Sequence, residues 1–247
     1  PGGTLITTGN VGNTPSVKAA VANALPGTTV LPLDGGDGSG SGRTVSFDLN
    51  GLDQVIAGLA NISGRSLRNQ RILNSGSQPA TLTIHNSSDF SFSGNINGTS
   101  LNFDKSGAGT QTLAGTNAYT GITSVSNGIL VLGNSLAMQN SALETSASVA
   151  GDAANGLRST VTSLTLGGLI GEKDLSSVFT TTNGGYSGIT SITLNVGSSG
   201  TCEYSGAIAD GSPGMSLTKS GSGIQILSGS NTWSGSTTLS AGILKLG

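Results

Sequence analysis

The amino-acid sequence predicts an all-β solenoid made of short strands, and three observations carry this prediction. The stretch 105–133, KSGAGTQTLAGTNAYTGITSVSNGILVLG, returns 114 residues later as 219–247, KSGSGIQILSGSNTWSGSTTLSAGILKLG, with 16 of the 29 positions identical. Glycines recur in phase in both copies, and apolar residues alternate with polar ones between them. A match of this length without a gap indicates an array of similar units rather than one globular fold.

The identical positions divide into corners and strands. Glycines at 107, 109, 115, 121 and 128, and at the equivalent positions of the second copy, mark places where the backbone turns or takes a positive φ. Leu113, Val125 and the run Ile129 to Leu132 lie between these corners, in segments too short and too β-branched for helices. Short strands separated by glycine corners are typical of a solenoid that buries one side-chain column per face.

This pattern carries a family resemblance. The string G-x-G-x-x-x-L-x-G-x-N-x-aromatic-[ST]-G-x-T, followed by G-x-L-x-L-G, resembles the autotransporter-associated β-strand repeat, also called the passenger-associated transport repeat. The resemblance is strongest over the two copies and weaker over the units between them. It implies a right-handed parallel β-helix outside the cell, in passenger regions of type V secreted bacterial surface proteins or in very large secreted repeat proteins. It implies no catalytic residue, because the motif is structural.

Composition excludes several function classes. Charged residues make up 9% and aromatic residues 4% of the 247 residues, Gly numbers 41, and the net charge is −2. Disordered chains usually carry high net charge, so the regular placement of Leu, Ile and Val favours an ordered fold. The charge provides no electrostatic footprint for nucleic acid or an anionic membrane. Cys202, the single cysteine, cannot form an intrachain disulfide, and no stretch approaches the ~20 apolar residues of a membrane span.

The N-terminal part is expected to open on the tail of a unit and to continue into a helix. Residues 3–6, GTLI, resemble the last strand of the repeated block. Apolar residues at i, i+3, i+4 and i+8 predict a short helix or helical loop over 15–25, with Ser16 as its N-cap and Pro26 beyond its end. The equivalent segment 134–150 is also Ala-rich but less periodic.

The glycine-rich stretch 34–42, DGGDGSGSG, is predicted to be a solvated loop. A serine-protease site would show Gly-Asp-Ser-Gly rather than Asp-Gly-Ser, and His85, the only histidine, lies on the wrong side in sequence order for that fold. Asp34 and Asp37 could contribute to a calcium site, but two carboxylates fall short of the usual six to eight oxygen ligands.

Weaker matches divide the rest of the chain into units. Residues 45–52 match 163–169 at an offset of 117, 81–84 match 191–194 at 110, and 92–96 match 204–208 at 112. Drifting offsets indicate insertions in turns between strands that keep their phase. The predicted organisation is one continuous solenoid with the tail of a preceding unit at 1–9, a first unit at 10–133 and a second at 134–247. At roughly 20 to 25 residues per coil, it would have about eleven coils.

Isolated reactive residues receive structural interpretations. The three arginines of 64–71, GRSLRNQR, could bind an anionic sugar, but a solvated loop face is favoured without an aromatic platform nearby. His85 is interpreted as a surface or turn residue, because no group of potential co-ligands accompanies it. Cys202, which aligns with Phe90, is interpreted as a small core residue rather than a nucleophile.

Three polar or aromatic positions recur in phase in the two copies: Lys105 and Lys219, Asn117 and Asn231, Tyr119 and Trp233. Within a repeat, such recurrence is expected if the residues serve the stacking of coils, with asparagines forming ladders or occupying left-handed corners and aromatics stacking along a face. An aromatic ladder that contacts carbohydrate is the sharper alternative, although each unit supplies only one such ring.

The predicted function is a non-catalytic structural or adhesive segment of a large bacterial extracellular or cell-surface repeat protein, giving a rigid fibre or stalk. The alternative is a β-helix enzyme or binding module acting on polysaccharide, which would require paired carboxylates in a groove. No catalytic, cofactor-binding or metal-binding residue is predicted, and no cofactor. The expected partners are neighbouring repeats of the same long chain or end-to-end copies, with a cell-surface polysaccharide or a host or neighbouring cell as candidate ligands.

Two further expectations follow. By the resemblance, the chain is expected outside the cell or on the outer surface of a Gram-negative-type bacterium. The terminal strand 243–246 is as apolar as its internal counterpart 129–132, and natural solenoids need polar capping coils at their ends. The chain is therefore expected to be an excerpt from a longer fibre or to stack end to end.

Overall fold

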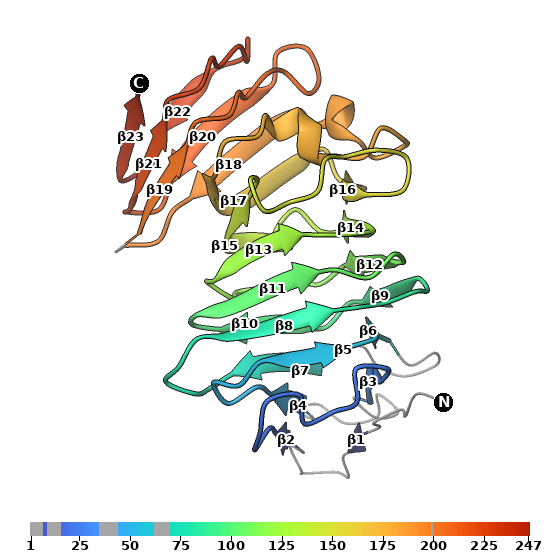
Figure 1. The fold of residues 1–247 in the computed structure, drawn as a ribbon. Coiled ribbons are helices and arrows are strands. Elements are labelled where there is room, and N and C mark those ends of the chain that lie inside the picture. The colour runs from blue at the N-terminus through green and yellow to red at the C-terminus, as the bar shows by residue number, and fades with distance from the viewer. Residues whose placement is uncertain (1–6, 9–15, 35–43, 62–69, 199) are drawn as a thin grey trace.

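The computed structural model describes residues 7–8, 16–34, 44–61, 70–198 and 200–247 (Figure 1). It is an all-β parallel solenoid of about eight turns, which confirms the predicted fold class. Every pairing between the described strands is parallel. The expected eleven coils were too many, because some coils are longer than predicted: Ser163 and Ser191, neighbours in adjacent turns, are 28 residues apart.

One side of the solenoid is a single nine-stranded sheet, called the long sheet below. Its strands, in chain order, are β5 (Gln54–Ile56), β8 (Ala80–Ile84), β11 (Leu101–Lys105), β13 (Ile122–Val125), β15 (Met138–Glu144), β17 (Ser163–Ile170), β18 (Ser191–Asn195), β20 (Ser216–Ser220) and β22 (Thr237–Leu239).

The other sides are built from shorter sheets. In three of these sheets, most strands directly follow a strand of the long sheet along the chain. The first sheet contains β1 (Thr7–Thr8), β3 (Val30–Asp34) and β6 (Gly58–Ala60), and the second contains β9 (Phe90–Phe92), β12 (Thr110–Leu113), β14 (Ile129–Leu132) and β16 (Gly156–Ser159). The third contains β19 (Thr201–Tyr204), β21 (Ile224–Leu227) and β23 (Ile243–Leu246). A further sheet closes the N-terminal turns with β2 (Ser16–Lys18), β4 (Val45–Asp48), β7 (Gln70–Asn74) and β10 (Asn95–Gly98).

The core is a set of narrow apolar columns along the solenoid. In β8 and β11, buried residues alternate with half-exposed ones, and Leu82 pairs with Phe103 inside while Thr81 pairs with Asn102 outside. Inward-facing residues of this kind form one cluster from Leu31 to Leu227. Because each backbone pairs with the turns on either side, thin columns suffice to hold a chain with few large side chains.

The stack forks at β17. Its first half, Ser163 to Leu166, pairs with β18, whereas its second half, Gly168 to Ile170, pairs with β15, and Leu166 pairs with both strands. The register of β15 shifts between Met138 and Ala142, where this change takes place. In Figure 1 the strands that follow β17 are inclined to those that precede it. β17 therefore joins two stacks of turns.

One local prediction was wrong. The segment predicted as a helix contains β2, in which Val17 pairs with Phe47, and Asn23 has a left-handed φ of 49° that ends any helical run. The equivalent Ala-rich segment 134–150, for which no helix was predicted, contains β15. Pairing with a neighbouring turn outweighs a short helical spacing here, because isolated helices of this length are marginal. Among the described residues, the helices are two single 3-10 turns, η1 (Leu175–Val178) and η2 (Tyr186–Gly188).

One repeat alignment was also wrong, whereas two others were confirmed. Residues 45–48 form β4 on the N-terminal closing sheet, but residues 163–165, the proposed partners of 46–48, lie in β17 of the long sheet. By contrast, 81–84 and 191–194 both lie in the long sheet, and Phe92 and Tyr204 occupy equivalent strands beside it. The tail at 3–6 lies outside the described residues.

The sequence predicts no membrane-spanning stretch, and the described helices bear on this prediction. Neither η1 nor η2 approaches the length of a span, and no helix in the described ranges is both long and apolar enough to cross a bilayer.

Candidate functional site

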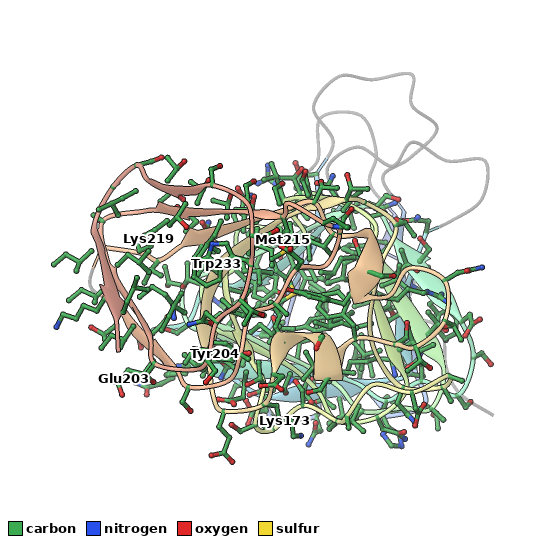
Figure 2. The ribbon with its side chains drawn as sticks, turned by 90° about the horizontal axis from the view of Figure 1, so that it is seen from above. Lys173, Glu203, Tyr204, Met215, Lys219 and Trp233 are labelled. Atoms are coloured by element: carbon green, nitrogen blue, oxygen red, sulfur yellow. The ribbon has the colours of Figure 1, made fainter. Side chains whose placement is uncertain are left out.

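The recurring residues of the repeated block converge inside the solenoid. Figure 2 looks down the axis and shows Lys219 and Trp233 within the ring of the last turns, with Glu203 at the rim. This interior cluster is the most chemically unusual part of the molecule, because it buries lysine and glutamine in columns that are otherwise apolar.

Lys105 occupies an inward position of β11, between Ile84 and Val125 in the neighbouring turns. It is fully buried, and its Nζ donates hydrogen bonds to the carbonyl oxygens of Gly107 and, at 3.0 Å, of Asn127 in the next turn. Burial lowers the pKa of Lys105 from 10.5 to about 8, against the opposing charges of nearby carboxylates. The lysine therefore ties a corner to the turn above it.

Lys219 repeats this arrangement in the second copy. It is fully buried, and its Nζ donates to the carbonyl oxygens of Ser220, of Gly221 at 2.8 Å and of Ala241 in the next turn at 3.3 Å. Burial also lowers its pKa. Each lysine sits under an invariant corner of the repeat: a Cβ at Gly242 would lie 2.9 Å from the Nζ, and that glycine has a φ of +69°. Glycine is needed here for both space and backbone conformation.

Gln111 and Gln225 form the second recurring contact, which reaches two turns back. The Gln111 side chain accepts from the backbone N–H of Leu59 at 3.0 Å and donates to the same residue's carbonyl at 3.1 Å. The Gln225 side chain makes the same pair of bonds with Leu169, at 3.0 and 2.9 Å. Both glutamines are fully buried. Each side chain thus replaces a missing strand partner for one residue two turns away.

Asn117 and Asn231 bridge adjacent turns. Asn117 accepts from the N–H of Ile96 at 2.8 Å in the preceding turn and donates to the carbonyl of Ala137 at 2.9 Å in the following one. Asn231 accepts from the N–H of Ile208 at 2.9 Å, but its amide nitrogen bonds to a carbonyl two residues earlier in its own turn. Asn117 therefore serves the stacking of turns, as predicted, but through backbone groups rather than through a ladder of asparagine side chains, and neither asparagine has a positive φ.

The aromatic position does not form a binding platform in the first copy. Tyr119 is 1% exposed, and its hydroxyl lies 2.7 Å from Thr123 Oγ1. Burial raises the pKa of Tyr119 to about 12. Trp233 is half-buried, and its Nε1 donates to Thr237 Oγ1 at 2.9 Å, the same i to i+4 contact. The alternative of a carbohydrate-contacting aromatic ladder is therefore wrong, since Tyr119 is not accessible.

The isolated residues behave as structural ones. His85 is exposed and its Nδ1 lies 3.2 Å from Ser106 Oγ. Cys202 is a free, buried thiol whose pKa is raised by burial. Its pairing with Gln225, like that of Phe90 with Gln111, confirms the predicted alignment. The side chains of the glycine-rich stretch 34–42 lie outside the described part of the chain, as do the first two arginines of 64–71, whereas Arg71 is exposed.

The described residues contain no cluster of three His, Cys, Asp or Glu side chains that could hold a metal ion. Two cavities have volumes of about 410 and 440 Å³. The first is lined mainly by polar groups, whereas the second also exposes the apolar side chains of Ala142, Val196 and Cys202. The recurring glutamine contact was missed at the sequence level. Its signal was the presence of glutamine at the same inward strand position in both copies, where an apolar residue would be expected.

Comparisons with known proteins bear on the same repeats. Residues 103–132 and 217–246 match the family described as passenger-associated-transport-repeat. The "Adhesin BmaC autotransporter" of Brucella suis biovar 1 (strain 1330) is 33% identical to this chain over 148 residues, which is 60% of the chain. The chain spans about 4% of the length of that relative. No solved structure matches the chain.

Proposed function

Because the chain contains two passenger-associated transport repeats, we propose that it is a structural and adhesive segment of a large bacterial extracellular or cell-surface repeat protein. It acts by supplying a rigid length of solenoid and by displaying its outer faces and loops to other surfaces. It is not an enzyme.

One observation carries this proposal: the recurring polar side chains are used to join turns. Lys105, Gln111 and Asn117 all lie in the interior and bond to backbone groups of other turns. In an enzyme, recurring or clustered polar groups would instead face a groove in which substrate binds. Contact with other molecules is therefore left to the outer faces and the loops.

Exposed apolar residues on β22 and β23 form a candidate stacking surface, called the end face below. Leu239 and Leu246 are 57% and 65% exposed, whereas their counterparts Val125 and Leu132 are 1% exposed because the next turn covers them. The amide nitrogen of Asn231 likewise bonds within its own turn, whereas that of Asn117 bonds to the next turn. We propose that a further turn of the same pattern covers this face, from a neighbouring repeat or from a second copy.

Adhesion is tested by displaying the chain on a bacterium that does not adhere by itself. Attachment of those cells to epithelial cells or to glass is expected to exceed attachment of cells that display an unrelated protein. Equal attachment on every surface would reject the adhesive role.

The end face is tested by sedimentation of the purified chain at increasing concentration. Self-association is expected, and the double substitution Leu239→Asp and Leu246→Asp is expected to remove it. Ile122→Asp is the matched control, because Ile122 is 42% exposed but lies on β13, which pairs with β11 on one side and β15 on the other and so is not part of the end face. A monomeric wild-type chain, or equal association of all three proteins, would reject the stacking role.

A further inference from the structure

The outer face of the long sheet carries ordered columns of hydroxyl groups beyond the fork. Strand pairing places Ser163, Ser191 and Ser216 in one column and Thr165, Thr193, Thr218 and Thr238 in the next. Their neighbours Leu164, Ile192 and Leu217 point inward and are buried. The hydroxyl columns therefore face outward as a consequence of the two-residue period of the strands.

The spacing of these groups is regular and their orientation is fixed. Adjacent strands lie about 4.8 Å apart, and alternate residues of one strand are about 6.6 Å apart. Threonine is β-branched and has few χ1 states, so its hydroxyl is held in place before a ligand arrives. In the described part of the chain, Ser191 bonds to Ser163 at 2.8 Å within the serine column. The hydroxyls of the threonine column have no hydrogen-bond partner among the described residues.

The columns are uncharged, in contrast to the same face before the fork. A third column beside the threonines contains Asn195 and Ser220, so all three columns consist of neutral polar groups. Before the fork, the outer face includes the carboxylates of Asp104 and Glu144. Hydroxyl and amide groups can both donate and accept hydrogen bonds, which suits a ligand that carries many hydroxyls and no charge.

A cavity lies at each end of this surface. The cavity of about 410 Å³ begins at Thr162, one residue before β17, and is lined by hydroxyl and amide side chains of the η1–η2 loop such as Thr182 and Asn183. The cavity of about 440 Å³ lies at the fork and is lined by Gly167 and Asn195 at the other end of the same strands. From Ser163 to Gly167 is four residues, or about 13 Å along the strand.

We propose that this surface, from the first cavity across β17 and β18 to the second, binds an uncharged glycan chain. The inference rests on the proposed adhesive function and names the class of partner. The ligand lies along the strands, its hydroxyls meet the serine and threonine columns, and the cavities receive sugar units at both ends. Because no described residue of the three columns or of the two cavity linings is positively charged, an anionic polysaccharide gains nothing from its charge there.

Affinity electrophoresis of the purified chain tests the proposal, with laminarin and galactomannan as neutral probes and alginate as the anionic probe. Retardation by at least one neutral probe is expected, and weaker or no retardation by alginate. The triple substitution Thr165→Val, Thr193→Val and Thr218→Val is expected to weaken binding to that probe by about tenfold or more, since it removes three hydrogen-bonding groups. Valine keeps the β-branched shape, so the strands are retained.

The matched control is Thr81→Val with Thr83→Val, which makes the same change on β8 before the fork. Its binding is expected to stay within about twofold of wild type, since it removes no group from the proposed surface. Circular dichroism confirms that each variant is folded. Equal binding by the triple variant and wild type, or retardation by alginate alone, would overturn the proposal.

The glycan-binding test and the adhesion assay can fail independently. A chain that promotes attachment to cells but binds neither neutral probe overturns the glycan surface and leaves the adhesive function standing. A chain that binds a neutral probe through the threonine column but promotes no attachment supports the surface and rejects the adhesive role.

Discussion

Replacing Gln111 by leucine removes the side chain that satisfies both backbone groups of Leu59. That residue is fully buried on β6, and the Gln111 amide supplies an acceptor at 3.0 Å and a donor at 3.1 Å. Leucine fills a similar volume but offers neither group. The substitution therefore isolates the hydrogen bonds from the packing.

The expected cost follows from the number of groups left without a partner. A buried donor or acceptor that loses its partner costs about 1–3 kcal/mol. Gln111→Leu leaves two such groups at Leu59, so the local free energy of opening should fall by about 2–6 kcal/mol. At ~1.4 kcal/mol per factor of ten, the lower bound is a drop of roughly 30-fold in protection of the Leu59 amide.

Hydrogen exchange of that amide is the suitable assay, because a solenoid need not unfold in a single transition. Gln70→Leu is the matched control: Gln70 is also fully buried, and neither of its amide atoms has a hydrogen-bond partner among the described residues. Its replacement should be neutral or stabilising, since it removes an unsatisfied polar group. Unchanged protection of Leu59 in Gln111→Leu, or an equal cost for both variants, would refute the reasoning.

Two other predictions concern the corner lysine and a close contact between turns. The free energy of unfolding of wild type, relative to that of Lys105→Met, should rise as pH increases from about 8 to 10.5. Lys105 releases its proton near pH 8 in the folded state and near pH 10.5 in the unfolded state. Between these values the unfolded state binds more protons, so raising the pH favours the folded state. Denaturant titrations below, within and above the window measure this, and a flat or falling difference would contradict it. Gly58→Ala should cost about 1–3 kcal/mol by overpacking, because its Cβ would overlap the ring of Phe90, and most of that cost should disappear in a Phe90→Ala background. A double-mutant cycle without coupling would count against the contact.

The parts of the fold that sequence reasoning predicted are those governed by contacts between adjacent turns. Repeat phase aligned Cys202 with Phe90, and the two residues pair with the equivalent glutamines of the next turn, Gln225 and Gln111. Alternation marked Leu113 and Val125 as apolar strand positions, and both are buried on β12 and β13. Such features follow from a two-residue strand period and one neighbour on each side.

The parts that were missed depend on contacts two turns apart. Asn195 reaches across β17 to bond with Asn140 at 2.9 Å, 55 residues earlier in the chain. The contact needs Gly167, whose Cβ would overlap the backbone of Asn140. Nothing in a local window distinguishes this glycine from those at ordinary corners. The fork and the cavity beside it could therefore not be predicted.

The candidate site was predicted only in outline. Recurrence in phase correctly assigned Lys105, Asn117 and Tyr119 to the stacking of turns, but it did not show that all three are buried. A lysine in an alternating strand usually faces solvent, because removing its charge from water is costly. Here the backbone carbonyls of a glycine corner compensate the ammonium group, and their positions depend on the tertiary fold.

These buried polar groups serve the register of the solenoid more than its stability. Apolar columns alone would tolerate a strand shifted by two residues, since every inward position would still meet another apolar residue. Gln111 cannot be shifted without leaving its own amide and the backbone of Leu59 unsatisfied, and Lys105 cannot leave the carbonyls of its corner. Each mismatch adds a penalty that the correct alignment avoids. A chain with a thin core and few aromatic residues thus obtains a single stacking arrangement from the same residues that recur in its sequence.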